Sequence, residues 1–151
     1  MQRVAEARVK VGDEVLGQIG AGLLVLACVE TYDTEADIDY LAAKIPALRI
    51  FDDLEGKMNL SLLDFGGKLL LISQFTLAAN ATKGNRPSYT AAARPDQALP
   101  LLDRFAAQLV AAGLQLQHGR FGANMQVSLV NDGPVTIILD SANRHTKKPP
   151  Q

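Results

Sequence analysis

Histidine, cysteine and tryptophan are nearly missing from this chain of 151 residues, which has two histidines, one cysteine and no tryptophan. His118 and His145 have no other ligand at metal-binding spacing, and a serine–histidine–aspartate arrangement would have to use one of them. A single cysteine cannot form a disulfide within the chain, which is typical of a reducing compartment. Cys28 lies in an apolar run, so we expect a buried thiol that packs as a small hydrophobe. The sequence predicts neither a metal site nor a cofactor.

Long apolar segments are missing as well. No segment reaches the length needed to cross a membrane, and the first residues lack the apolar core of a signal peptide. Glycine patterns of the Walker or dinucleotide-binding type are also not found. We therefore expect a cytoplasmic protein without a membrane partner.

The net charge of −1 argues against a polycationic nucleic-acid binder, but the charge is unevenly distributed. Residues 30–64 contain nine acidic and three basic residues, whereas the chain from residue 65 onward contains nine basic and four acidic ones. Such asymmetry can direct a polyanion to one face of a protein. On charge alone, ordinary surface solvation is the simpler interpretation.

The length and the order of hydrophobic patterns predict one α+β domain with a barrel-like, mostly antiparallel β-sheet core and about two main helices. Residues 1–141 would form this domain, and residues 142–151 a loosely ordered C-terminal tail. Thr34 is the predicted cap of the first helix, which Pro46 should kink or shorten. A second helix is predicted near 96–110, and strands are predicted at 8–11, 15–19, 23–29, 58–63, 68–77, 114–117, 125–130 and 135–139.

Polar side chains occur at the end of one strongly apolar strand. Ser73, Gln74 and Thr76 follow the buried run 69–72, and a buried polar group without a partner costs about 1–3 kcal/mol. Two interpretations are open: the strand end emerges at a rim, or the strand delivers a polar cluster to a pocket. Residues 82–88 add a glycine- and proline-containing loop with two cations, which either holds phosphate or is a simple turn.

Gly133-Pro134 lies between two predicted strands, where a sheet does not normally accept proline. Proline removes a ladder donor, so it belongs at edges, bulges and tight turns. The pair is therefore either an ordinary turn or a segment that presents backbone atoms to a ligand.

Residues 73–77 (SQFTL) and 131–136 (NDGPVT) resemble the two signature motifs of the D-aminoacyl-tRNA deacylase family. The order and separation of the motifs are similar too, and the resemblance runs from about residue 2 to residue 140. Four further segments agree in register: 49–51, 56–60, 86–88 and 119–123.

The resemblance implies a homodimer that hydrolyses the ester joining a D-amino acid, or mischarged glycine, to the 3′ end of tRNA. It implies that Gly133-Pro134 is a cis dipeptide that enters the partner subunit's site and rejects L-aminoacyl-tRNA. The implied catalytic residues are Ser73, Gln74, Phe75 and Thr76. The implied contacts with the substrate or the tRNA 3′ end are Asn131, Thr136, Met125, Arg86 and Lys83.

Several alternatives stay open at this point. An aminoacyl ester is already activated, so positioning by main-chain groups and the 2′-hydroxyl of tRNA competes with nucleophilic attack by Thr76. A non-catalytic module that binds the tRNA 3′ end, and a small-molecule-binding barrel, are the alternatives to an enzyme. Relatives typically have several more residues before Gln2, so the first strand is either truncated or misassigned at its start. They also more often carry glycine in place of Cys28, which we interpret as a packing change.

Overall fold

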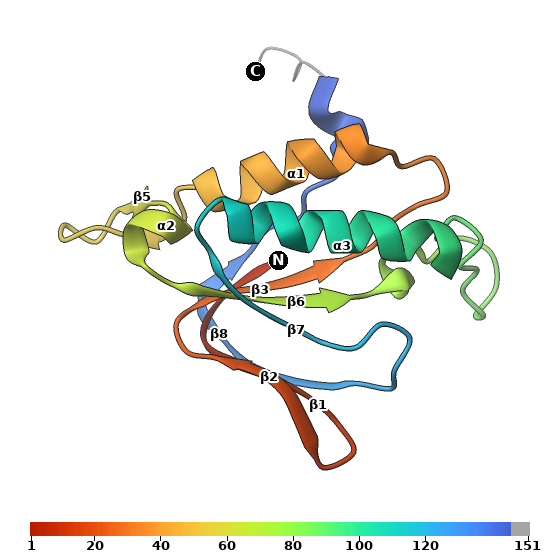
Figure 1. Ribbon diagram of the computed structural model, residues 1–151, viewed down its shortest axis with the longest axis horizontal. Helices are drawn as coiled ribbons and strands as arrows, with labels where there is room; N and C mark the ends of the chain where they lie inside the picture. The colour runs from red at the N-terminus through yellow and green to blue at the C-terminus, as the bar shows by residue number, and fades with distance from the viewer. Residues whose placement is uncertain (146–151) are drawn as a thin grey trace.

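The computed structural model describes residues 1–145, in which a curved, barrel-like sheet is covered on one side by two helices (Figure 1). The six strands are β1 (Gln2–Val11), β2 (Glu14–Ile19), β3 (Gly22–Ala27), β6 (Lys68–Ser73), β7 (Gln115–His118) and β8 (Gln126–Thr136). β1 pairs antiparallel with β2, β3 and β8, whereas β3–β6 and β6–β7 are parallel pairs. The predicted α+β class and barrel-like sheet are confirmed. The sheet is mixed, however, because crossovers that contain helices join β3 to β6 and β6 to β7 in parallel.

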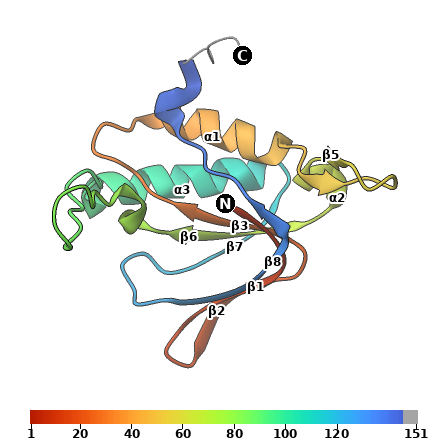
Figure 2. The same ribbon diagram turned by 180° about the vertical axis from the view of Figure 1, so that it is seen from behind.

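The two long helices, α1 (Glu35–Ala47) and α3 (Pro95–Ala111), lie side by side across one face of the sheet (Figures 1 and 2). Thr34 is the N-cap of α1, as predicted. Its main-chain amide and its hydroxyl each donate a hydrogen bond of 2.9 Å to the carboxylate of Asp37. Pro46 lies in the last turn, and α1 ends one residue later.

Five short elements complete the described chain: β4 (Phe51–Asp52), β5 (Met58–Leu60), α2 (Leu62–Phe65), and the 3₁₀ helices η1 (Phe75–Ala78) and η2 (Ser141–His145). Five strand predictions need correction here. The strand expected at 8–11 begins at Gln2. The strand expected at 58–63 ends at Leu60 and is followed by α2, and the one expected at 68–77 ends at Ser73 and is followed by η1. The strands expected at 125–130 and 135–139 are one strand, β8, which ends at Thr136.

The expected C-terminal tail starts inside η2, which packs against the beginning of α1 through an ion pair between Arg144 and Asp37. The remaining part of that tail, 146–151, lies outside the described residues. At the other terminus, β1 begins at Gln2, and the Met1 ammonium donates to the Ile137 carbonyl at 2.8 Å. Burial lowers the pKa of this ammonium group.

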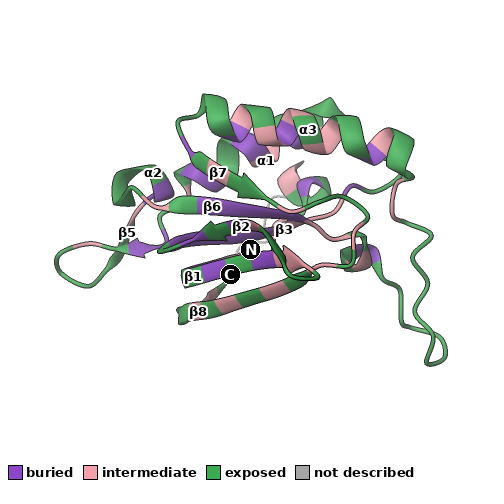
Figure 3. Ribbon diagram, turned by 60° about the horizontal axis from the view of Figure 1, so that its bottom comes forward, coloured by how far each residue is buried: buried purple, intermediate pink, exposed green. Residues whose placement is uncertain are grey.

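The interior has two hydrophobic clusters. One lies between the helices and the sheet and includes Ile38, Leu69 and Phe105; the other lies inside the barrel-like sheet and includes Val9, Leu24 and Leu70. Because neighbouring residues of a strand point to opposite faces, the buried runs of β3 and β6 contribute to both clusters (Figure 3). This double burial explains why these two strands are apolar at nearly every position.

The two ends of the sheet, β2 and β7, come together at Gly17. A Cβ atom at Gly17 would lie 3.2 Å from Cβ of Gln117 and 3.4 Å from the carbonyl oxygen of His118. Glycine therefore permits the close approach that nearly closes the barrel. In the described part of the chain, no helix is both long and apolar enough to span a lipid bilayer.

Candidate active site

Strands β3 and β6 end at the same edge of the sheet because they are parallel, with Ala27 paired to Ser73. Just beyond this edge, the Gln74 amide donates to the Ala27 carbonyl at 2.7 Å. A narrow cavity of about 20 Å³ opens there, and Ser73, Gln74 and Phe75 contribute to its wall. The polar strand end thus meets a pocket, which is also lined by Ala27, Cys28, Val29, Ala93, Ala98, Leu102 and Phe121.

Thr76 follows these residues in η1, and its hydroxyl accepts a hydrogen bond from the Gln74 side-chain amide. An amide cannot take up a proton as a general base does. The arrangement therefore fixes the Gln74 side chain and does not activate the Thr76 hydroxyl for attack.

Cys28 lies differently from the sequence-based expectation. We expected a buried thiol within a strand, but β3 ends at Ala27, and Cys28 is partly exposed with its side chain at the pocket. Its Sγ lies 3.7 Å from the Phe75 carbonyl oxygen, to which the thiol donates. Partial burial raises the pKa of this thiol, so Cys28 stays neutral and is a poor nucleophile.

His118 does not take part in the pocket. The ring is exposed at the end of β7, and its Nδ1 lies 2.9 Å from the Gly119 carbonyl oxygen. Among the side chains that the structure describes, histidine, cysteine and carboxylate groups do not gather in any group of three that could hold a metal ion.

Met125 does not line the pocket but packs with the hydrophobic cluster inside the barrel, close to β6. A Cβ atom at Gly119 would lie 2.5 Å from the Met125 sulfur and 3.2 Å from Cδ1 of Ile72, the residue before Ser73. Gly119 also donates its amide to the Leu71 carbonyl at 3.0 Å. The structure therefore brings Met125 close to the strand that carries the polar cluster.

Gly133-Pro134 lies at the opposite end of β8, in a bulge. The register between β1 and β8 shifts on both sides of Val4, and residues 132–135 have no regular partner in β1. The expected cis bond is wrong: no peptide bond among the described residues is cis, so Gly133-Pro134 is trans. Within this bulge Gly133 has a φ of +109°, a conformation that favours glycine.

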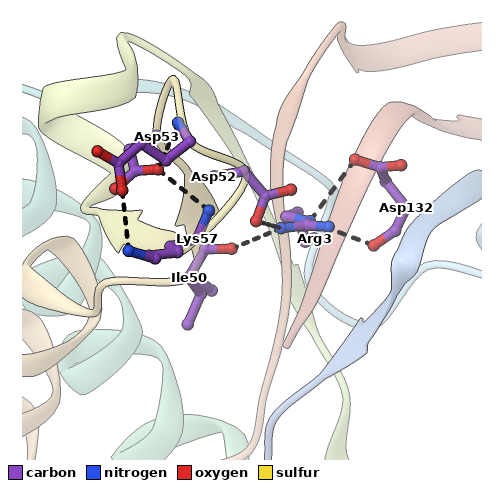
Figure 4. A network of polar contacts seen from close by, with 7 residues as sticks. Arg3, Ile50, Asp52, Asp53, Lys57 and Asp132 are labelled. Atoms are coloured by element: carbon purple, nitrogen blue, oxygen red, sulfur yellow. Dashed lines mark hydrogen bonds and ion pairs between the residues drawn. The ribbon is translucent and has the colours of Figure 1, made fainter.

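The Arg3 side chain binds the inner side of this bulge (Figure 4). Its side chain is only 9% exposed; Nε donates to the Asp132 carbonyl at 3.2 Å, and Nη1 donates to the Ile50 carbonyl at 2.9 Å. The carboxylates of Asp52 and Asp132 lie 3.4 and 3.5 Å from the guanidinium. A Cβ atom at Gly133 would lie 2.7 Å from Arg3 Nη2, so any larger residue would meet the guanidinium.

Asn131 closes the bulge by donating its side-chain amide to the carbonyls of Arg3 and Val135, both at 3.0 Å. Thr136 pairs with Gln2, whose side-chain amide donates to its hydroxyl at 3.2 Å. We did not identify Arg3 from the sequence. The available signal was one arginine directly before the apolar residues of a strand.

The predicted site residues therefore fall into three places. Ser73, Gln74 and Phe75 line the pocket, and Thr76 is hydrogen-bonded to Gln74. Met125 lies close to the strand that carries them. The bulge with Asn131, Gly133, Pro134 and Thr136 lies at the far end of β8, about 26 Å from Met125 along an extended strand. Lys83 and Arg86 lie on a fully exposed loop that lines neither place.

Comparison with known proteins decides the family. The sequence model of the family described as D-Tyr-tRNA(Tyr) deacylase matches residues 1–140. This chain belongs to that family. A D-aminoacyl-tRNA deacylase of Chloroflexus aurantiacus is 59% identical over 142 residues, covering 94% of this chain and 89% of the relative. The relative of the same name from Chlorobaculum parvum is 54% identical over 145 residues, covering 95% of this chain and 97% of the relative.

A solved structure of similar fold bears the name c-Myc DNA Unwinding Element Binding Protein. It has a TM-score of 0.86 and 40% sequence identity, and the match covers 92% of this chain and 95% of that one. The two relatives are named as enzymes, so the prediction that this chain is an enzyme is confirmed.

Proposed function

We propose that this deacylase-family chain hydrolyses the ester bond of D-aminoacyl-tRNA and releases the free D-amino acid and tRNA. The observation that carries the proposal is the pocket at the joint end of β3 and β6, which Ser73, Gln74 and Phe75 line. An aminoacyl ester is an activated acyl group, so positioning and stabilisation of the developing oxyanion suffice for catalysis. Main-chain groups around residues 74–76 and the 2′-hydroxyl of the tRNA supply this chemistry. Thr76 acts by positioning, since its hydroxyl is bonded to an amide.

Selection against L-aminoacyl-tRNA is assigned to the main chain of Gly133-Pro134. The segment is exposed, and Arg3 and Asn131 fix it from its inner side. A rigid backbone that excludes an L side chain by contact does not exclude glycine, which has no side chain. Glycine mischarged on tRNA is therefore a second substrate.

A second subunit is required for this role, because the pocket and the bulge lie at opposite ends of β8. Leu129 lies midway between Met125 and Gly133. A twofold axis near Leu129 therefore superposes the pocket end of one subunit on the bulge of the other. The outer face of β1 and β8 carries a hollow of about 220 Å³ at this midpoint, lined in part by Glu6, Arg8, Ser128 and Val130.

The size of the pocket agrees with this arrangement. A cavity of about 20 Å³ has room for roughly one water molecule and does not enclose an aminoacyl ester. We therefore place the missing wall of the site on the partner, as a homodimer with cross-subunit active sites.

The deciding experiment compares D-tyrosyl-tRNA, L-tyrosyl-tRNA and glycyl-tRNA, with spontaneous hydrolysis subtracted. The expected result is rapid loss of the D-amino acid and of glycine, while the L-ester persists. Equal loss of D- and L-tyrosine would refute selection by chirality. Binding of tRNA without any hydrolysis would instead favour a non-catalytic module that binds the 3′ end.

A further inference from the structure

The loop between η1 and α3 is the most positively charged exposed part of the described chain. No acidic residue occurs from position 65 to position 95, whereas Lys83, Arg86 and Arg94 fall within or at the end of this loop. Residues 79–91 are all exposed, and so is Arg94 (Figure 3). We call residues 80–94 the basic loop.

Both ends of the basic loop contact residues that line the pocket. Phe75, which lines the pocket before the loop, contacts Tyr89 edge to face with ring centroids 5.4 Å apart. After the loop, the Ala93 amide donates to the Val29 carbonyl at 2.9 Å, and both residues line the pocket. The position of the loop is therefore fixed relative to the pocket.

The neck of the loop is closed by a pair of hydrogen bonds. Asn80 and Ser88 exchange main-chain hydrogen bonds of 2.8 and 2.9 Å, and the Asn80 side chain accepts from the Thr82 amide at 3.0 Å. Closure of this kind lowers the entropy that the loop loses when it binds a partner. The seven residues beyond the neck, 81–87, carry Lys83 and Arg86 up to about 10 Å further from the pocket rim.

The chemistry of the loop tip fits a phosphate backbone. Proteins that hold single-stranded nucleotides combine cations with aromatic rings for stacking, but residues 81–87 contain no aromatic residue. Cations without stacking groups suit a duplex, in which the bases are paired and the phosphates recur at regular intervals along each strand. When the 3′ end of a tRNA is bound at the pocket, its duplex must lie outside the rim, where the exposed loop also extends.

We propose that the basic loop is a docking surface for the double-stranded acceptor stem of tRNA. Lys83 and Arg86 contact stem phosphates, and Arg94 contacts the backbone closer to the pocket. This assignment rests on the proposed function, and it removes Lys83 and Arg86 from the set of contacts with the terminal nucleotide. The loop supplies affinity for the whole tRNA and takes no part in ester cleavage.

The test uses two substrates and two matched double variants. The substrates are D-tyrosyl-tRNA and 3′-O-(D-tyrosyl)adenosine, which carries the same ester without a stem. One variant is K83Q/R86Q in the loop. The control is K44Q/K68Q, which removes the same charge at two exposed positions outside the loop, in the last turn of α1 and at the first residue of β6. Thermal unfolding of all variants checks that the fold is unchanged.

For K83Q/R86Q, kcat/KM with D-tyrosyl-tRNA should fall about 10–100-fold near 0.1 M salt, with kcat nearly unchanged. The slope of log(kcat/KM) against log salt concentration should become shallower by about 2, because each phosphate contact contributes about 0.9. Hydrolysis of the adenosine ester should be unchanged, as should all values for K44Q/K68Q. An equal loss with both substrates, or no loss with tRNA, would overturn the proposal.

A separate measurement keeps this proposal distinct from the proposed function. Binding of an uncharged RNA hairpin with the acceptor-stem sequence, followed by fluorescence anisotropy, requires no ester hydrolysis. If the wild-type protein hydrolyses neither ester, weaker hairpin binding by K83Q/R86Q still supports the docking surface. Absence of hairpin binding by the wild-type protein overturns it.

Discussion

At the scale of single residues, Thr76 separates the two mechanisms that the sequence leaves open. Among the described residues, Gln74 is the only side chain that is hydrogen-bonded to its hydroxyl, and an amide is no general base. Thr76→Ala should therefore keep at least about a tenth of the wild-type kcat, a cost below about 1.4 kcal/mol. Loss of a true nucleophile costs about 10⁶-fold in a serine protease. Single-turnover hydrolysis of D-tyrosyl-tRNA measures the difference, with Thr76→Ser as the conservative control. Complete inactivity of a folded Thr76→Ala protein would restore the nucleophile mechanism.

The backbone conformation of Gly133 underlies the proposed selection between D- and L-aminoacyl-tRNA. Gly133→Ala places a Cβ atom 2.7 Å from Arg3 Nη2 at a φ of +109°, so we expect a stability loss of about 1–3 kcal/mol and a lower D/L ratio of kcat/KM. Gly12→Ala is the matched control. Gly12 also has positive φ, +57°, but a Cβ atom there meets nothing within 4 Å. If both variants kept the wild-type D/L ratio, Gly133-Pro134 would have no part in selection.

At the scale of secondary-structure elements, Asp37 links the start of α1 to η2. Burial alone would raise the pKa of its carboxyl, but hydrogen bonds from the amide and hydroxyl of Thr34, from Arg144 and from Ser141 outweigh burial and lower it to about 2. Because the folded-state pKa lies below the unfolded value of 3.8, the stabilisation is complete above about pH 4. It is lost as the pH falls towards 2.

Asp37→Asn should therefore lower the free energy of unfolding by about 1–2 kcal/mol at pH 7, through the weakened helix cap and charged hydrogen bonds. The difference from the wild-type protein should shrink between pH 4 and pH 2. Urea denaturation across this range measures both effects, and Asp103→Asn on the exposed side of α3 serves as the control. A difference that stays constant with pH would contradict the linkage.

The elements also show where sequence-based prediction succeeds. The helices and the buried strands were predictable, because each carries a long apolar pattern and Thr34 marks a helix start. The end of β6 was not. Phe75, Thr76 and Leu77 have strand-like side chains, but the partner strand β3 ends at Ala27 and offers no further ladder. The residues therefore coil into η1 and place the polar cluster at the pocket.

The site was predictable only where its residues are neighbours in the sequence. Residues 73–76 form one motif, and the structure keeps their side chains together. Arg3 was missed because its partners, Ile50 and Asp132, lie 47 and 129 positions away. The strand break expected at Pro134 was also wrong, because the bulge absorbs the proline within β8.

At the scale of the whole molecule, the proposed twofold axis gives a test of assembly. Val130 is 51% exposed at the edge of the outer hollow, so Val130→Glu should fold normally but should prevent the two outer faces from meeting. We expect a monomer by light scattering and at least a tenfold loss of deacylase activity, about 1.4 kcal/mol. Val15→Glu is the control, because Val15 is 49% exposed in the same sheet but near the β1–β2 turn. A fully active monomeric Val130→Glu protein would disprove the cross-subunit site.

The approach of β2 to β7 at Gly17 has a consequence for motion. Among the described strands, no ladder of backbone hydrogen bonds joins β2 to β7. This seam is held by packing around Gly17 and by the exposed ion pair between Glu14 and Arg120, whereas backbone ladders join the other neighbours. Separating the seam breaks no row of hydrogen bonds and costs less than separating β3 from β6. Since Phe121 follows β7 and lines the pocket, we expect the Phe121 side of the pocket to move more readily than the sides formed by β3 and β6.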